Sequence, residues 1–289
     1  MRKLKVCFID IVGLKFTGDT LSKRGIGGSE SATLYMAEEL TKLGLEVNVY
    51  NKCEEEGVFN GVTYKDLSSI KQDKSVYDII ISLRSVLPLV PQKFGVQIWE
   101  KFRKDIGPFE YLVPRAKYRA VWMHDTFLEG EEWLEPLLVD GVIDDVFTLT
   151  DWHSHYISQA DHWNTPKRNY DVIKKHIFQT RNGIKYYPPA NDLKDKDPNL
   201  FVYNSSITKG MIPLVKNVWP KVKEKIPDAK LVIIGGYYSH AGPNGERDKG
   251  EVDYFELTDS YKNKNNITFT GVIKQSEVAE ILKKATFMI

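Results

Sequence analysis

Cysteine, long apolar runs and net charge are all scarce in this chain, and each scarcity excludes a class of protein. Cys7 and Cys53 are its two cysteines, too few for a disulfide framework and suited to a reducing compartment. No run approaches the roughly 18 apolar residues of a membrane-spanning helix, and Asp10 interrupts the first apolar run too soon for a secretory leader. With 40 basic and 39 acidic residues the formal charge is +1, which argues against a nucleic-acid binder. We therefore expect a soluble, cytoplasmic globular protein.

The apolar residues that are present recur in a pattern of alternating strands and helices. The length of 289 residues suits one large or two medium domains. Hydrophobic residues make up 42% of the positions, enough for the cores of such domains. In the first half the pattern predicts strands and one long helix, and such alternation is typical of a doubly wound, mostly parallel sheet. The predicted strands are 4–11, 46–50, 77–83, 119–124 and 145–150, and the predicted helix is 31–43.

The pattern is interrupted at 181–198, a polar and proline-bearing stretch that suits an interdomain connection. We therefore predict an N-terminal domain over 1–190 and a C-terminal domain over 199–289. In the second domain we expect strands at 201–204, 231–236, 267–271 and 286–289, helices at 213–225 and 276–284, and a long irregular insertion at 237–262. About ninety residues make half of such a domain, so we expect the chain to be cut short.

A glycine-rich turn, Gly25-x-Gly27-Gly28-Ser29-Glu30, follows the first strand and opens the first helix. Glycine lets a ligand approach the backbone, and free N–H groups at a helix N-terminus suit a phosphate. The spacing matches neither the dinucleotide fingerprint nor a Walker loop. The residues alone leave two hypotheses open, a phosphate site or a turn with glycines for geometry.

Three further candidates follow predicted strands. His124 ends the strand 119–124 and borders the crevice where open α/β sheets bind ligands, although local backbone could equally satisfy it. His153 and His155 invite a metal hypothesis, but no third ligand stands nearby, and Thr150 or Asp151 as a helix N-cap explains the cluster more simply. Lys209, before Gly210, could meet a phosphate or lie in a solvated loop.

Basic and aromatic residues alternate between Lys93 and Arg119. Such a mixture can touch an anionic membrane or a nucleic acid. Glu100, Asp105 and Glu110 dilute the charge, which favours an ordinary solvated face.

The ordered series of short motifs resembles the family 4 retaining glycosyltransferases, two-domain GT-B enzymes that transfer a sugar from a nucleotide donor to an acceptor. The resemblance covers nearly the whole chain. It rests on short matches, of which the last is the most specific: Gly27-Gly28-Ser29-Glu30, Leu43-Gly44-Leu45-Glu46-Val47, Arg181-Asn182-Gly183-Ile184, Lys209-Gly210, and Trp219-Pro220 with 226–236.

The resemblance implies a GT-B fold, with two Rossmann-like doubly wound parallel-sheet domains and the second one incomplete. It implies a hexosyltransferase-type enzyme that binds the nucleotide sugar in the interdomain cleft, with His124 near the transferred sugar. It further implies retention by front-face attack, with no metal and no cofactor besides the nucleotide-sugar substrate. The residues it places at the donor are Gly27, Gly28, Lys209, Gly210 and Gly235.

The acceptor is a glycan, a lipid or a protein that the sequence does not name, and the stretch from Lys93 to Arg119 allows peripheral membrane contact. Two other hypotheses stay open. One is a sugar-nucleotide epimerase, which would turn over donor without an acceptor. The other is a non-catalytic GT-B relic that acts as a binding subunit, since Tyr203-Asn204-Ser205-Ser206 lacks the arginine expected before Lys209 and no Glu-x7-Glu motif follows 286–289.

Overall fold

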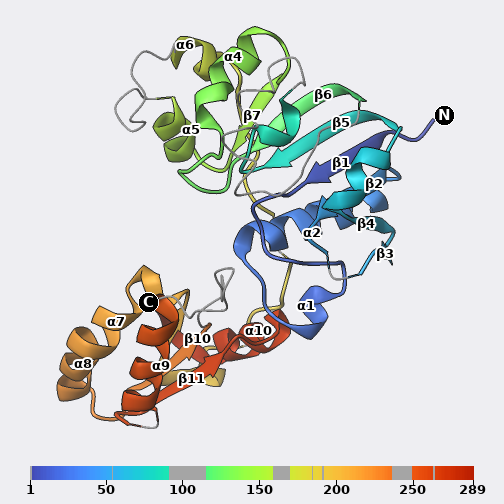
Figure 1. Ribbon diagram of the computed structural model, residues 1–289. Helices are drawn as coiled ribbons and strands as arrows, with labels where there is room; N and C mark the ends of the chain where they lie inside the picture. Colours follow the sequence, from blue (N-terminus) through green and yellow to red (C-terminus); the bar gives the residue numbers. More distant parts are fainter. Residues whose placement is uncertain are drawn as a thin grey trace. The chain divides into compact units, whose positions relative to one another are not determined.

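The computed structural model describes residues 2–53, 55–90, 115–158, 170–183, 185–190, 192–235, 249–262 and 264–289. Its chain divides into two compact units (Figure 1). Unit 1 comprises residues 1–20 and 26–185, and unit 2 comprises residues 21–25 and 186–289.

Unit 1 is built on an eight-stranded sheet of order β3-β4-β2-β1-β5-β6-β7-β8. All neighbouring strands run parallel except β3 and β4. Its strands are β1 (Lys5–Ile9), β2 (Glu46–Asn51), β3 (Gly57–Phe59), β4 (Val62–Asp66), β5 (Val76–Leu83), β6 (Arg115–Trp122), β7 (Asp145–Thr148) and β8 (Ile177–Gln179).

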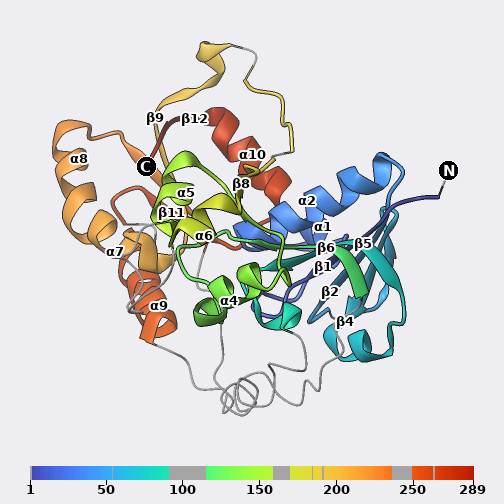
Figure 2. The same cartoon turned by 90° about the horizontal axis from the view of Figure 1, so that it is seen from above.

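Helices lie on both faces of this sheet, as Figures 1 and 2 show for α2 and α4. Alternate residues of β1 explain the two layers, since Cys7 and Ile9 face the core that includes α4, α5 and α6, while Val6 and Phe8 are buried toward the other face. The α-helices of unit 1 are α2 (Gly28–Lys42), α4 (Leu134–Val139), α5 (Asp151–Ile157) and α6 (Tyr170–Lys175), and its 3₁₀ turns are η1 (Leu67–Gln72), η2 (Leu87–Leu89) and η3 (Glu131–Trp133). The single turn α1 (Thr20–Lys23) begins at the last residue of the first segment of unit 1 and continues into residues 21–25 of unit 2.

Unit 2 has a four-stranded parallel sheet of order β11-β10-β9-β12. The core on one face includes Trp219 of α8 and Leu257 of α9, and α10 packs on the other face. The elements are η5 (Leu193–Asp195), β9 (Asp197–Asn204), η6 (Ile207–Lys209), α7 (Met211–Pro213), the π-helical turn η7 (Leu214–Val218), α8 (Trp219–Lys225), β10 (Lys230–Ile234), α9 (Lys249–Tyr261), β11 (Ile267–Gly271), α10 (Gln275–Lys284) and β12 (Ala285–Met288).

The helix predicted over 213–225 contains the π-helical turn η7. Pro220 explains the departure, because it has no N–H to donate to the carbonyl four residues earlier and its ring crowds that carbonyl. The buried Trp219 fixes this segment, since its indole N–H donates to the carbonyl of Asn265 at 2.8 Å.

The prediction of an irregular insertion over 237–262 is wrong for residues 249–261, which form α9. Tyr254 and Leu257 are buried in the core of unit 2, and Tyr261 packs against it. This spacing of three and four residues is that of one helix face, so burial of the apolar stripe outweighs the polar composition. Residues 237–248 lie outside the described residues.

Candidate functional site

The strand order of each sheet reverses at one point, and this point locates a candidate site in each unit. In unit 1 the order reverses between β1 and β5, and in unit 2 between β9 and β12. Open parallel sheets bind ligands outside the carboxyl ends of the strands at such a switch point. The residues to consider are therefore those that follow β1, β5 and β6 in unit 1 and those that follow β9 and β10 in unit 2.

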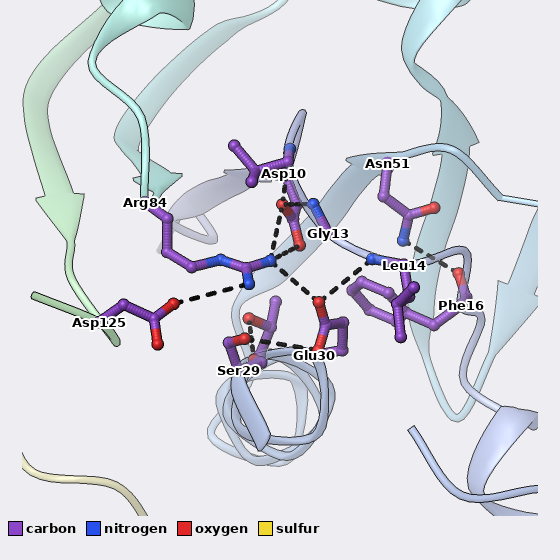
Figure 3. A network of polar contacts seen from close by, with 11 residues as sticks. Asp10, Gly13, Leu14, Phe16, Ser29, Glu30, Asn51, Arg84 and Asp125 are labelled. Atoms are coloured by element: carbon purple, nitrogen blue, oxygen red, sulfur yellow. Dashed lines mark hydrogen bonds and ion pairs between the residues drawn. The ribbon is translucent and has the colours of Figure 1, made fainter. Parts of the chain in front are cut away.

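Four charged residues meet at the switch point of unit 1, and we call them the carboxylate–arginine cluster: Asp10, Glu30, Arg84 and Asp125 (Figure 3). Nη2 of Arg84 lies 2.9 Å from Oε1 of Glu30 and 3.3 Å from Oδ2 of Asp10. Nη1 of Arg84 lies 4.0 Å from Oδ2 of Asp125. The Asp10 and Glu30 side chains are almost fully buried, with 0% and 3% exposed. Charged groups so buried need partners, and Arg84 supplies one to each.

The cluster also fixes the loop that follows β1. Oδ1 of Asp10 accepts the backbone N–H of Gly13 at 2.7 Å and that of Val12 at 3.2 Å. Oε1 of Glu30 accepts the N–H of Leu14 at 3.2 Å. Burial raises the pKa of Asp10 above its usual value, although Arg84 and the two backbone N–H groups act against this. The loop is therefore tied to the first turn of α2 by side chains that point inward.

The predicted glycines at this turn have different environments. Gly27 is the N-cap of α2, and a Cβ there would lie 2.1 Å from Oε2 of Glu30. Gly28 is the first residue of α2, and a Cβ there would meet no atom within 4 Å. The Glu30 carboxylate therefore closes the Gly27 side of the helix end, while the Gly28 side is open. Glu30, in the first turn, also interacts favourably with the helix dipole.

His124 lies two residues beyond the end of β6. The structure thus ends the strand earlier than the predicted 119–124. Its ring centroid is 4.5 Å from that of Trp122, and its Nε2 atom is buried without a hydrogen-bond partner among the described residues. Burial lowers the pKa of His124 to about 3, with Arg84 and His153 acting in the same direction. His124 is therefore a neutral imidazole at physiological pH.

His153 has a structural explanation. Oγ1 of Thr150 accepts the His153 backbone N–H at 3.0 Å, which confirms the predicted N-cap of α5. The Leu149 N–H donates to Nδ1 of His153 at 3.3 Å, so Nε2 carries the proton and donates to the carbonyl of Asp125 at 3.0 Å. Within the described ranges, no three His, Cys, Asp or Glu residues are placed to hold a metal ion.

In unit 2, Lys209 and Gly210 follow β9 at its switch point. The Lys209 side chain is exposed and forms no ion pair within the part of the chain that the structure describes. The Tyr203 hydroxyl shares its one proton between the carbonyl oxygens of Ser206, at 2.9 Å, and Lys209, at 3.0 Å, and this fixes the backbone of the turn that carries Lys209. Gly210 has φ of 101°, a left-handed conformation that favours glycine.

Gly235, at the end of β10, is required by the fold. Its φ is 109°, and a Cβ would lie 2.9 Å from the carbonyl oxygen of Ser205. Its N–H donates to the Gly271 carbonyl at 2.9 Å. A glycine is thus needed here whether or not a ligand binds.

In unit 1 the structure places Gly27, Gly28 and His124 at the carboxyl ends of the parallel strands. In unit 2 it places Lys209, Gly210 and Gly235 at the carboxyl ends of the strands of that sheet. It adds Asp10, Glu30 and Arg84, which the sequence analysis did not identify as a site. Residues 93–114 of the basic and aromatic stretch lie outside the described residues, while Lys117 on β6 pairs with Asp78 at 2.9 Å. None of the helices in the described residues has both the length and the apolar character to cross a membrane.

Comparison with known proteins gives one family match, which lies in unit 2. Residues 187–289 match the family model of glycosyl transferases group 1. No curated protein sequence matches the chain.

Three solved structures share the fold at low sequence identity. The catalytic domain of starch synthase IV from Arabidopsis thaliana, bound to ADP and acarbose, is similar with a TM-score of 0.61 and 11% identity, over 99% of this chain and 78% of that one. A glycosyltransferase from Rickettsia africae is similar with a TM-score of 0.56 and 14% identity, over 100% of this chain and 73% of that one. An α-glucosyltransferase in complex with UDP-glucose and DNA containing an abasic site is similar with a TM-score of 0.55 and 15% identity, over 100% of this chain and 72% of that one. The predicted α/β fold of the GT-B glycosyltransferases is confirmed.

Proposed function

We propose that this chain transfers a hexosyl group from a nucleotide-sugar donor to an acceptor hydroxyl, with retention of the anomeric configuration. The observation that carries the proposal is the match of residues 187–289 to the group 1 glycosyltransferases. The proposal assigns the donor nucleotide chiefly to unit 2 and the acceptor to unit 1. It places the reaction in the cytoplasm, and it names a glycan, lipid or protein as the acceptor class, since a formal charge of +1 gives little attraction to nucleic acid.

The donor's diphosphate needs positive charge, and Lys209 is the group in unit 2 that we assign to it. Its ammonium group is exposed at the carboxyl end of β9 and has no carboxylate partner among the described residues. Gly210 follows in the left-handed conformation and leaves room beside the backbone, because a Cβ there would meet nothing within 4 Å. A free lysine beside an open backbone is a chemically suitable phosphate ligand.

In unit 1 we assign the open side of the α2 N-terminus, at Gly28, to an anionic group of a substrate. The helix has 15 residues, so its N-terminal N–H groups carry the partial positive charge of a full helix dipole. Glu30 lies on the Gly27 side and is engaged by Arg84 and Leu14. The carboxylate is thereby held away from the space beside Gly28.

His124 suits a role in orientation of the transferred sugar. Because its pKa is about 3, it is neutral and accepts or donates a hydrogen bond without carrying a charge. In front-face transfer the acceptor proton passes to the departing diphosphate, the glycosidic bond to the acceptor oxygen forms, and the bond to the phosphate oxygen breaks on the same face. The protein then contributes orientation and stabilisation of the departing charge, and needs neither metal nor cofactor.

The test is a transfer assay with UDP-, GDP- and ADP-sugars, each with a panel of glycan, lipid-linked and peptide acceptors. Released nucleoside diphosphate reports turnover, and the proton coupling at the anomeric carbon of the product reports its configuration. Acceptor-dependent release with a product of the donor's configuration supports the proposal. Conversion of the donor into an epimeric nucleotide sugar without any acceptor, seen by NMR of the nucleotide sugar, points to the epimerase. A folded protein that converts no donor points to the binding subunit.

A further inference from the structure

Arg84 occupies a constrained position in unit 1. It follows β5 directly, its φ is 57°, and 12% of its side chain is exposed. Left-handed backbone is costly for a residue with a Cβ, so surrounding contacts must hold Arg84 in this conformation. Such residues concentrate at functional sites.

The backbone of Arg84 brackets the segment Met123–Leu128, which we call the His124 loop. The Arg84 N–H donates to the carbonyl of Trp122 at 3.0 Å, just before the loop. The Arg84 carbonyl accepts the N–H of Glu129 at 2.9 Å, just after the loop. Both ends of the His124 loop are therefore anchored on one residue.

The side chain of Arg84 makes the remaining connections (Figure 3). Its guanidinium contacts Asp10 after β1 and Glu30 in α2, and its Nη1 faces the carboxylate of Asp125 within the His124 loop. One planar, permanently charged group thus joins three segments that are far apart in sequence. A lysine cannot reproduce this, because its single ammonium group has no rigid fork.

A second contact to the His124 loop comes from α5. Nε2 of His153, in α5, donates to the carbonyl of Asp125 at 3.0 Å. The charged and titratable groups that act on His124 are thus Arg84 after β5 and His153 in α5, and Asp125 acts in turn on His153. His124 lies between Trp122, which is tied to the Arg84 backbone, and Asp125, which is tied to both Arg84 and His153.

We propose that Arg84 is a positioning residue for sugar transfer, because it fixes the loop that follows β1, the first turn of α2 and the His124 loop together and so places the His124 imidazole. This inference rests on the proposed function for its reaction. The placement of His124 by Arg84 is a statement about the protein itself, and it is measurable without turnover.

Two variants separate the charge of Arg84 from its shape. Arg84→Gln removes the charge but retains an N–H donor for the buried carboxylates, and Arg84→Lys retains the charge but loses the planar fork. The matched control is Arg2→Met, which removes an arginine paired with Asp78 at the opposite end of β5, where Lys117 still pairs with that carboxylate. Circular dichroism establishes that each variant is folded.

The first readout is an NMR titration of the histidine side chains. In Arg84→Gln we expect the pKa of His124 to rise by at least about one pH unit, since a nearby positive charge that disfavours imidazolium is gone. In Arg84→Lys the charge remains, so we expect the pKa to stay low while the chemical shifts of the His124 ring protons move, because the imidazole is displaced from the Trp122 ring that lies 4.5 Å away. In Arg2→Met we expect neither the pKa nor these shifts to change. A folded Arg84→Gln protein with the same His124 titration as the wild type would overturn the proposal.

The second readout is transfer. We expect both Arg84 variants to lose at least about tenfold in kcat and clearly less in nucleotide affinity, because the His124 loop is misplaced while the nucleotide contacts assigned to unit 2 remain. Wild-type kcat in Arg84→Lys would overturn the proposal even if Arg84→Gln does not fold. If the wild-type protein transfers no sugar, the proposed function fails and with it the role in transfer, while the titration still decides whether Arg84 places His124.

Discussion

Gly28 offers a test in which fold and function respond in opposite directions. A Cβ at Gly28 meets no atom within 4 Å, and its backbone is not in the left-handed region. Gly28→Ala therefore adds a methyl group to open space at the first position of α2. The change costs nothing in contacts, and it reduces the conformational freedom of the unfolded chain.

The expected change in stability follows from this open environment. A compatible glycine-to-alanine change stabilises a protein by about 0.4–1 kcal/mol, which in a unit of this size raises Tm by about 1–4 °C. Gly27→Ala is the matched comparison, because its Cβ would lie 2.1 Å from the Glu30 carboxylate. Displacing that carboxylate from Arg84 should cost about 1–3 kcal/mol.

The assay pairs thermal unfolding with nucleotide titration. We expect Gly28→Ala to unfold at a higher temperature and bind nucleoside diphosphate more weakly, and the bulkier Gly28→Val to block phosphate approach. A fall in the Tm of Gly28→Ala would refute the placement of Gly28 in open space. Normal donor affinity in Gly28→Val would refute the assignment of this turn to the donor.

Two further predictions concern titratable groups. His124→Ala should reduce kcat more than nucleotide affinity, and equal losses in kcat and affinity would make His124 merely a binding residue. Because the pKa of His124 is about 3, this residue should add no inflection to the pH dependence of the wild-type rate between pH 5 and 8. Burial alone would raise the pKa of Asp73, but hydrogen bonds from Ser75, Tyr77 and Tyr50 lower it to about 2. This carboxylate therefore stabilises the fold above its unfolded pKa near 3.8 by about 1 kcal/mol after allowance for solvent screening. The contribution is lost as pH falls through 2, so the difference in unfolding free energy between wild type and Asp73→Asn should be much smaller at pH 2 than at pH 7 in urea titrations. A difference of the same size at both pH values would contradict the assignment.

The buried strands could be predicted from sequence because their apolar runs are continuous. The predicted strands 4–11, 46–50 and 77–83 coincide with β1, β2 and β5 to within two residues at each end. Each is covered on both faces, and this burial produces the apolar run.

The hairpin of β3 and β4 was missed although its signal is present. Asn60 and Gly61, both with positive φ, form its two-residue turn, and Asn-Gly is a strong hairpin signal. The three-residue strand β8 has no comparable signal, because its pairing with β7 is a tertiary contact.

The carboxylate–arginine cluster could be found from sequence only with the strand order. Asp10 and Arg84 each follow an apolar strand, but they are 74 residues apart. That they meet depends on β1 and β5 being neighbours, which no local pattern states. Glu30 was noted within the glycine motif, but its ion pair with Arg84 depends on the same topology.

The central claim, a donor-nucleotide site that depends on Lys209, is tested most directly by calorimetric titration of the wild-type protein and Lys209→Ala with UDP, GDP and ADP. The control is Lys225→Ala, an exposed lysine at the far end of α8 in the same unit. We predict saturable binding of one nucleotide, a loss of about 1.5–3 kcal/mol in Lys209→Ala, the worth of a charge-assisted hydrogen bond, and wild-type affinity in Lys225→Ala. Failure of the folded protein to bind any of the three nucleotides, or equal affinity in wild type and Lys209→Ala, would contradict the account.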